Sequence, residues 1–66
     1  MAWTFRDVER RLHREGWILR RQTGSHRVWK SPDGLRTVVV AGRPSGTVSR
    51  GMLAEIRRTS GIKEFR

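Results

Sequence analysis

The sequence predicts an α+β domain in which a helix, three antiparallel strands and a second helix follow one another along the chain. Three observations lead to this prediction: a helical apolar stripe near the N-terminus, three β-prone runs separated by turn residues, and a second helical stripe near the C-terminus. A chain of 66 residues has room for one domain, residues 1–66, so we expect both helices to cover the same face of the sheet. The other face of the sheet should stay open.

The first predicted helix covers about residues 5–15. Thr4 is a favourable N-cap, and Asp7 stands three residues later, as in a capping box. The apolar stripe has helical spacing and consists of Phe5, Val8 and Leu12. Gly16 follows directly and predicts the end of the helix.

Three β-prone runs occupy the middle of the chain. They read WILRRQ (residues 17–22), HRVWK (26–30) and RTVVVA (36–41), and they are rich in β-branched and aromatic residues. A turn at Gly24 separates the first two runs, and the Pro-Asp-Gly turn of residues 32–34 separates the second from the third. Short strands joined by tight turns predict an antiparallel meander.

The second predicted helix follows an irregular segment, residues 42–50. Ser49 is a suitable N-cap, and Gly61 followed by Ile62 predicts a Schellman ending. The apolar stripe between them consists of Met52, Leu53 and Ile56. We also expect Phe65 to fold back onto the core.

The charge of the chain indicates a polyanionic partner. Fifteen Lys and Arg residues stand against six Asp and Glu residues, which gives a net charge of +9. Between residues 16 and 54, Asp33 is the sole acid among seven basic residues, so the middle of the chain carries a nearly unopposed positive charge.

Several functional classes are disfavoured by the composition. The sequence has no cysteine and no cluster of His, Asp or Glu at ligand spacing, so we expect neither a metal nor another cofactor. No apolar run approaches the ~20 residues needed to cross a bilayer, and no signal peptide is evident, which favours a cytoplasmic protein.

His26 is the candidate catalytic residue, and its surroundings leave two interpretations open. Strand alternation places His26 with Val28 on one face and Arg27 with Trp29 on the other, but it does not say which face is buried. His26 could therefore be an ordinary structural or surface histidine. Alternatively, it is a proton-transfer group inside a phosphate-binding patch, because basic residues surround it in the sequence.

An RNA substrate would suit the second interpretation. RNA supplies its own nucleophile, the 2′-hydroxyl, so the protein needs only to move a proton and hold the phosphate. The residues expected to bind RNA around His26 are Arg20, Arg21, Gly24, Ser25, Arg27 and Lys30. Gly24 has an equally good structural explanation, because a hairpin turn often needs a glycine with positive φ.

Residues 15–34, EGWILRRQTGSHRVWKSPDG, resemble the HicA family of small bacterial toxins, as do the following VVV strand and the closing RGMLAEIRRTSGIKEF. These toxins are the mRNA interferases of HicA–HicB toxin–antitoxin pairs. The resemblance implies a fold like that of double-stranded-RNA-binding domains and endonucleolytic cleavage of mRNA that stops translation. It also implies that His26, in the Gly-Ser-His position, is catalytic. The implied partners are mRNA and a HicB-like antitoxin, with a monomer when free and a hetero-oligomer with the antitoxin.

Two departures from the family pattern affect the expected chemistry. Many relatives have a Pro-x-His element after the third strand, where this chain has Ala41-Gly42-Arg43, and Ser31 precedes Pro32 where a histidine is often found. We therefore expect no second catalytic imidazole. His13 is expected on the helix surface, and a basic RNA-binding module without catalysis remains the alternative function.

Overall fold

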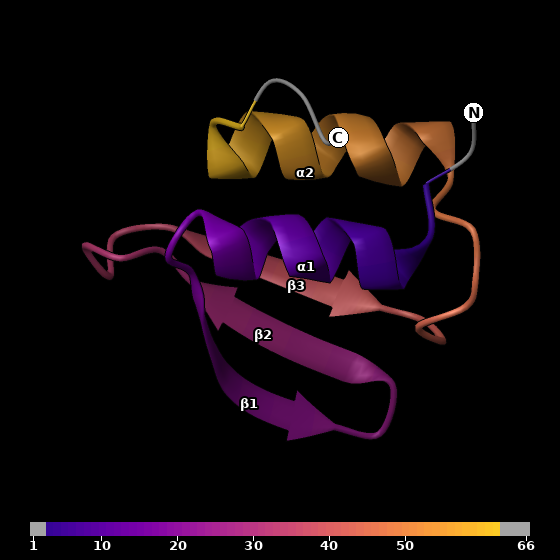
Figure 1. Cartoon of the computed structure of the whole chain (residues 1–66), viewed down its shortest axis with the longest axis horizontal. Helices are drawn as coiled ribbons and strands as arrows, with labels where there is room; N and C mark the ends of the chain where they lie inside the picture. The colour runs from indigo at the N-terminus through magenta and orange to yellow at the C-terminus, as the bar shows by residue number, and fades with distance from the viewer. Residues whose placement is uncertain (1–2, 63–66) are drawn as a thin grey trace.

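The computed structural model describes residues 3–62 and has the predicted order of elements (Figure 1). The elements are α1 (Phe5–Arg14), β1 (Ile18–Thr23), β2 (His26–Lys30), β3 (Thr37–Ala41) and α2 (Arg50–Ser60). The strands form one antiparallel sheet in the order β1-β2-β3, which confirms the predicted α+β class. The expected docking of Phe65 lies outside the described residues. Neither described helix has the length and hydrophobicity that would let it span a bilayer.

Helix α1 begins with the predicted capping box. The Thr4 hydroxyl accepts a hydrogen bond from the backbone N–H of Asp7 at 3.1 Å, and the Asp7 carboxylate accepts one from the backbone N–H of Thr4 at 3.1 Å. Hydrogen bonding of the Asp7 carboxylate to the Thr4 side chain and to the Thr4 backbone N–H lowers the pKa of Asp7, because it favours the charged form. The capping box therefore fixes the first turn of α1, at the point where the chain begins to cover the sheet.

Helix α2 begins as predicted but ends differently. The Ser49 hydroxyl accepts from the N–H of Met52 at 3.2 Å, as an N-cap should. At the other end Gly61 adopts φ 76° and donates to the carbonyl of Arg57 at 2.9 Å. The N–H of Ile62 bonds to the Ser60 hydroxyl at 3.1 Å. The predicted Schellman ending is wrong, because Ser60 offers this N–H a nearer acceptor, and the helix ends in the single-bond αL motif.

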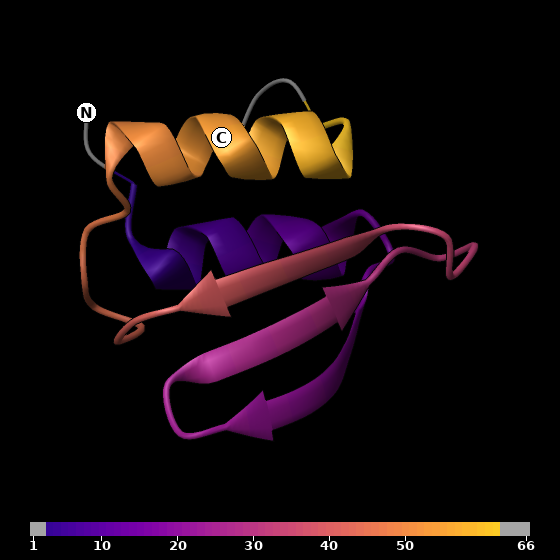
Figure 2. The ribbon, with the colours of Figure 1, turned by 180° about the vertical axis from the view of Figure 1, so that it is seen from behind.

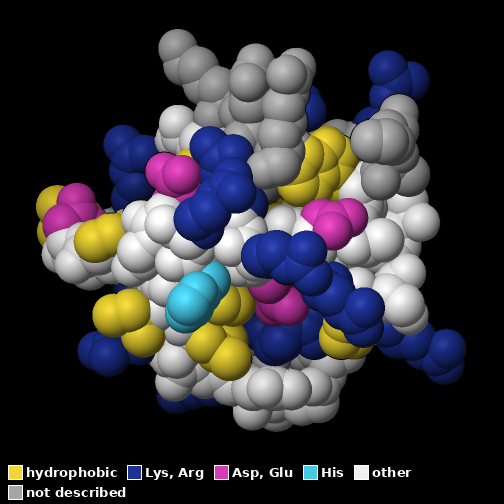
Figure 3. Space-filling view, in the orientation of Figure 1, with side chains coloured by type: hydrophobic (Ala, Val, Ile, Leu, Met, Phe, Trp, Pro, Cys, Tyr) yellow, Lys and Arg dark blue, Asp and Glu magenta, His cyan; other side chains and the backbone are white. Residues whose placement is uncertain are grey.

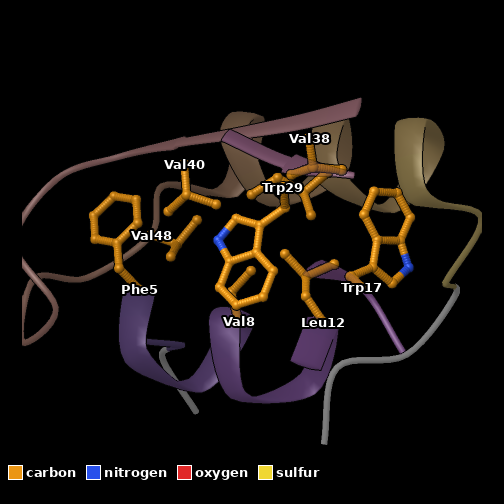
Figure 4. Close-up of a cluster of buried hydrophobic side chains, with 9 residues drawn as sticks. Phe5, Val8, Leu12, Trp17, Trp29, Val38, Val40 and Val48 are labelled. Atoms are coloured by element: carbon orange, nitrogen blue, oxygen red, sulfur yellow. The ribbon is translucent and has the colours of Figure 1, made fainter. Parts of the chain in front are cut away.

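Both helices lie on one face of the sheet and enclose the core (Figures 1 and 2). Side chains from α1 point toward those of β3, with the Trp29 ring between them (Figure 4). The buried apolar residues are Phe5, Val8, Leu12, Trp17, Trp29, Val38, Val40, Val48 and Ile56. The helical and strand stripes of the sequence thus meet in one cluster.

The burial of β2 decides which face of the sheet is open. Arg27 and Trp29 are buried toward the helices, so His26, Val28 and Lys30 point away from them. Val39, which pairs with Val28, is 50% exposed. No described helix covers this outer face.

Strand β1 lies at the edge of the sheet away from the helices, and all its residues are exposed (Figures 1 and 2). A bulge interrupts its pairing, because Ile18 pairs with Lys30 whereas Arg21 pairs with Val28. Lys30 and Val28 share a face, so Ile18 and Arg21 share it too, although they are three positions apart. The bulge thereby turns Arg21 to the open side.

Candidate functional site

The outward side of the sheet, called the open face below, brings most of the candidate residues together. Arg20 belongs to it because Arg20 lines the same shallow depression as Ile18 and Lys30. Its members are Ile18, Arg20, Arg21 and Thr23 of β1, His26, Val28 and Lys30 of β2, and Thr37, Val39 and Ala41 of β3.

His26 is exposed at one end of the open face, where β2 begins. It pairs with Thr23 of β1 on one side and with Ala41 of β3 on the other. Within residues 3–62 the imidazole has no hydrogen-bond partner, so both ring nitrogens are available to a bound molecule.

The turn before His26 is a two-residue hairpin connection. Gly24 has φ 59°, whereas Ser25 has no positive φ, which is the pattern of a type II′ turn. A Cβ on Gly24 would meet no atom within 4 Å, so the requirement for glycine is conformational. The turn presents both its residues to solvent next to His26.

Cations lie along the open face at two distances from His26. Arg21 is the diagonal neighbour of His26 across the β1–β2 pair, a relationship that brings Cβ atoms within roughly 7–8 Å. Lys30 is four residues further along β2, about 14 Å away along the backbone at ~3.4 Å per residue, and its ammonium donates to the Thr37 hydroxyl at 2.7 Å. A phosphate bound beside His26 is therefore nearer to Arg21 than to Lys30.

Acidic residues are absent from the described strands. The acids of residues 3–62 are Asp7, Glu9, Glu15, Asp33 and Glu55, which lie on or beside the helices or in the β2–β3 turn. On the side of the molecule that carries α1, acidic and basic side chains are interleaved (Figure 3). The positive charge of the open face is thus unopposed within its own strands, which suits a polyanion.

A comparison with known protein families shows to which family the chain is related. A family model described as the HicA toxin of bacterial toxin–antitoxin systems matches residues 5–62. The chain belongs to the HicA toxin family. It is therefore a toxin of the toxin–antitoxin type, a class that acts together with an antitoxin. The search of curated proteins gave no match.

One predicted RNA-binding residue of this HicA toxin lies away from the open face. Arg27 is 7% exposed and forms an ion pair with Glu9 of α1. Its Nη1 donates to the carbonyl of Ser25 at 3.3 Å, and its Nη2 donates to the carbonyl of Gly42 at 2.7 Å. We therefore revise the prediction that Arg27 holds an RNA phosphate, because its guanidinium points into the protein and is bound there.

Sequence reasoning missed Glu9, the partner of Arg27. Its carboxylate also accepts a hydrogen bond from the Trp29 indole N–H at 3.1 Å. The available signal was its position, because Glu9 follows Phe5 by four residues and so flanks the buried stripe of α1. A charged residue at such a position needs a buried partner.

The depression beside Lys30 lies at the other end of the open face from His26. Its walls are formed by Ile18, Arg20, Lys30, Ser31, Pro32, Asp33 and Gly34. Hydrogen bonds from the Ser31 hydroxyl and from the N–H of Leu35 hold the Asp33 carboxylate, and they lower its pKa. Asp33 thus organises the β2–β3 turn. The positive charges of the depression come from Arg20 and Lys30.

The remaining imidazole does not join the site. His13 is exposed on α1, as expected for a helix-surface histidine. Ser31, at the position where relatives often have histidine, is buried, and its hydroxyl donates to Asp33 and accepts from the N–H of Arg36. Trp17 and Trp29 are core residues and are unavailable for stacking on bases.

Proposed function

We propose that this HicA toxin is an endoribonuclease that cleaves mRNA by attack of the 2′-hydroxyl, with His26 as the general acid–base residue. The observation that carries the proposal is the exposed, unpartnered imidazole of His26 on a cationic sheet face whose described strands contain no acid. An imidazole exchanges protons near neutral pH, and cations beside it favour a bound phosphate.

The proposed reaction assigns separate tasks to the residues of the open face. His26 takes the proton of the 2′-hydroxyl while the 2′-oxygen bonds to phosphorus. The bond from phosphorus to the 5′-oxygen breaks, and that oxygen leaves with a proton from solvent or from the imidazolium. Arg21, the diagonal neighbour of His26, stabilises the charge on the phosphate oxygens.

Arg20 and Lys30 are proposed to hold neighbouring phosphates of the same strand. Both line the depression at the other end of the open face from His26. Ser25 and Gly24 are proposed to let the RNA backbone approach, since both are exposed beside His26. This reaction has no step assigned to a metal, because the substrate carries the nucleophile.

We propose that a HicB-like antitoxin silences the toxin by covering the open face. Ile18 and Val39 expose apolar surface among the cations of that face, which suits a partner with both acidic and apolar groups. The free toxin would be a monomer in the cytoplasm, where mRNA is found, and a hetero-oligomer with the antitoxin.

An RNA-binding module without catalysis is the second candidate function. It is favoured by the single histidine among the described residues of the open face, because leaving-group protonation often uses a second acid. Such a module would bind the same RNA without producing new ends.

Cleavage of a labelled RNA by matched histidine variants tests the proposal. H26A should lose about 10²–10⁴-fold in cleavage rate while its circular dichroism spectrum and melting temperature stay near those of wild type, since the side chain is exposed. H13A, also an exposed histidine, should cleave like wild type. Equal cleavage by H26A and wild type would exclude His26 as the catalyst, and binding without any cleavage by wild type would favour the second candidate.

A further inference from the structure

We propose that Arg27 is a positioning residue for His26: anchored on Glu9, its guanidinium braces the backbone on both sides of the strand start that carries the imidazole. This inference rests on the proposed function for its catalytic consequence. Its structural half can be measured without any cleavage assay.

The first argument is the burial of the ion pair. The side chains of Arg27 and Glu9 are 8% and 15% exposed. Taking the two charges of a buried pair out of water costs free energy that can exceed the attraction between them. An apolar pair of the same volume is often as stable. Stability by itself therefore gives little reason for an arginine at this inner position of β2.

The second argument is the geometry of the guanidinium. Nε donates to the Glu9 carboxylate, Nη1 to the carbonyl of Ser25 at 3.3 Å, and Nη2 to the carbonyl of Gly42 at 2.7 Å. The planar fork of arginine presents donors on three separate nitrogens to three acceptors that lie apart, whereas lysine carries all its donors on one nitrogen. Arg27 thus connects α1, the turn before His26 and the end of β3.

The third argument is that these acceptors flank His26. Ser25 immediately precedes it, and its carbonyl also accepts a hydrogen bond from the N–H of Gly42 at 3.2 Å. Ala41, the cross-strand partner of His26, immediately precedes Gly42. The backbone around His26 is therefore held from the inner face, while its imidazole stays free on the open face.

The fourth argument is the rigid support behind this brace. Glu9 accepts from the Trp29 indole at 3.1 Å as well as from Arg27, so its carboxylate is fixed by two donors. Gly42 packs so closely on Phe5 of α1 that an added Cβ would overlap the ring. An acid–base residue needs its reacting atoms placed to a fraction of an ångström, and a displacement of about 1 Å can cost roughly 100-fold in rate.

The test uses a double variant that removes the brace without leaving a buried charge. In R27M/E9Q, the amide carbonyl at position 9 still accepts from the Trp29 indole, and no unpaired ion remains. We expect kcat to fall roughly 10- to 100-fold, with the RNA dissociation constant and its salt dependence unchanged. The matched control is R58M/E55Q, which removes the exposed ion pair of α2 and should leave both quantities at wild-type values.

Hydrogen exchange supplies a readout that is independent of catalysis. The N–H of Gly42 should exchange faster in R27M/E9Q than in wild type, because the guanidinium no longer ties the carbonyls of Ser25 and Gly42 together, while the amides of α2 keep their protection. Unchanged Gly42 exchange would overturn the brace. If H26A proved fully active, the proposed function would fail, yet this measurement would still decide whether Arg27 holds the turn.

Two further outcomes decide against the inference. If R27M/E9Q raised the RNA dissociation constant and lowered its salt slope with kcat unchanged, Arg27 would be a phosphate ligand. R27K keeps a charge for Glu9 but has all its donors on one nitrogen, so it should keep the ion pair with Glu9 without recovering the wild-type kcat. Full recovery of kcat by R27K would show that the charge matters and the brace does not.

Discussion

His26 and Arg27 are neighbours in the chain, but the His26 side chain lies on the open face of the sheet and the Arg27 side chain is buried against α1. Strand alternation thus separates a free imidazole from the arginine that follows it. The same alternation divides the basic residues of β2, because Lys30 can meet a polyanion whereas Arg27 serves the fold. Variants on the open face should therefore change RNA binding, whereas variants of Arg27 should change the placement of His26.

The identity of the nucleophile can be tested with a modified substrate. An RNA with a single 2′-deoxyribose at the scissile position should resist cleavage, whereas the unmodified RNA should be cut in excess EDTA and leave a 2′,3′-cyclic phosphate or its 3′-phosphate product. Mass spectrometry of the fragments distinguishes these ends. A 3′-hydroxyl end, or inhibition by EDTA that added metal reverses, would contradict attack by the 2′-hydroxyl.

The RNA-binding surface can be tested by charge removal. R21Q/K30Q should weaken RNA binding at low salt and reduce the slope of log K against log[salt] by roughly 0.7 for each phosphate that the variant no longer neutralises. R57Q/R58Q on α2 removes the same charge away from the open face and should have a smaller effect. Fluorescence anisotropy over a salt series measures both variants, and an equal weakening would show that binding depends on net charge alone.

The antitoxin interface should coincide with the open face. We expect an interface that buries roughly 1,200–2,000 Å² in total and that is weakened by charge reversal at Arg21 and Lys30. In the complex His26 should be protected from a histidine-modifying reagent, while the exposed His13 should still react. Reaction of His26 at the same rate in the free and bound toxin would indicate inhibition without occlusion.

Gly42 should be the glycine least tolerant of alanine. Its φ is 145°, and an added Cβ would overlap the Phe5 ring, so G42A should destabilise the fold by about 1–3 kcal/mol. G51A, with no atom within 4 Å of its added Cβ in the exposed first turn of α2, should instead stabilise by up to ~1 kcal/mol. Urea denaturation compares the two, and a stability order opposite to this one would refute the assigned packing of Gly42 on Phe5.

Acid should destabilise the protein through Asp7 and Asp33. Hydrogen bonds in the folded state lower the pKa of both carboxyls below their ordinary value of 3.8, so their contribution is present above that pH and lost as pH falls through the lowered values. D7N/D33N should therefore be less stable than wild type at pH 7, with a difference that shrinks below pH 3.8. Urea titrations between neutral pH and about pH 2 measure this, and a constant difference would contradict it.

Much of the fold was readable from the sequence because local rules suffice for it. Thr4 with Asp7, and Ser49, mark helix starts by their capping hydrogen bonds, and Gly24 marks a turn by its positive φ. The spacing of Phe5, Val8 and Leu12 was enough to predict the buried side of α1. These features depend on residues within about four positions of each other.

Some features of the candidate site could be predicted from the sequence, whereas others became clear only in the structure. The Gly-Ser-His stretch and the run of cations were visible in the sequence, and so was the resemblance that the family comparison confirmed. The face of β2 that is buried was not visible, because Val28 and Trp29 both have reason to be covered. Packing against α1 settled it: Trp29 fills the core and its indole bonds to Glu9, so His26 has to face outward.

The sequence by itself therefore determined the elements, their order, the excess of positive charge and the family, since each follows from local pattern or composition. Only the tertiary structure decided which cations share a surface with His26. The β1 bulge turns Arg21 outward, and the partnership of Arg27 with Glu9, 18 residues away in the chain, holds Arg27 inside. Side chains distant in sequence determine these placements, because strand register and buried charge pairing are satisfied only when the layers pack together.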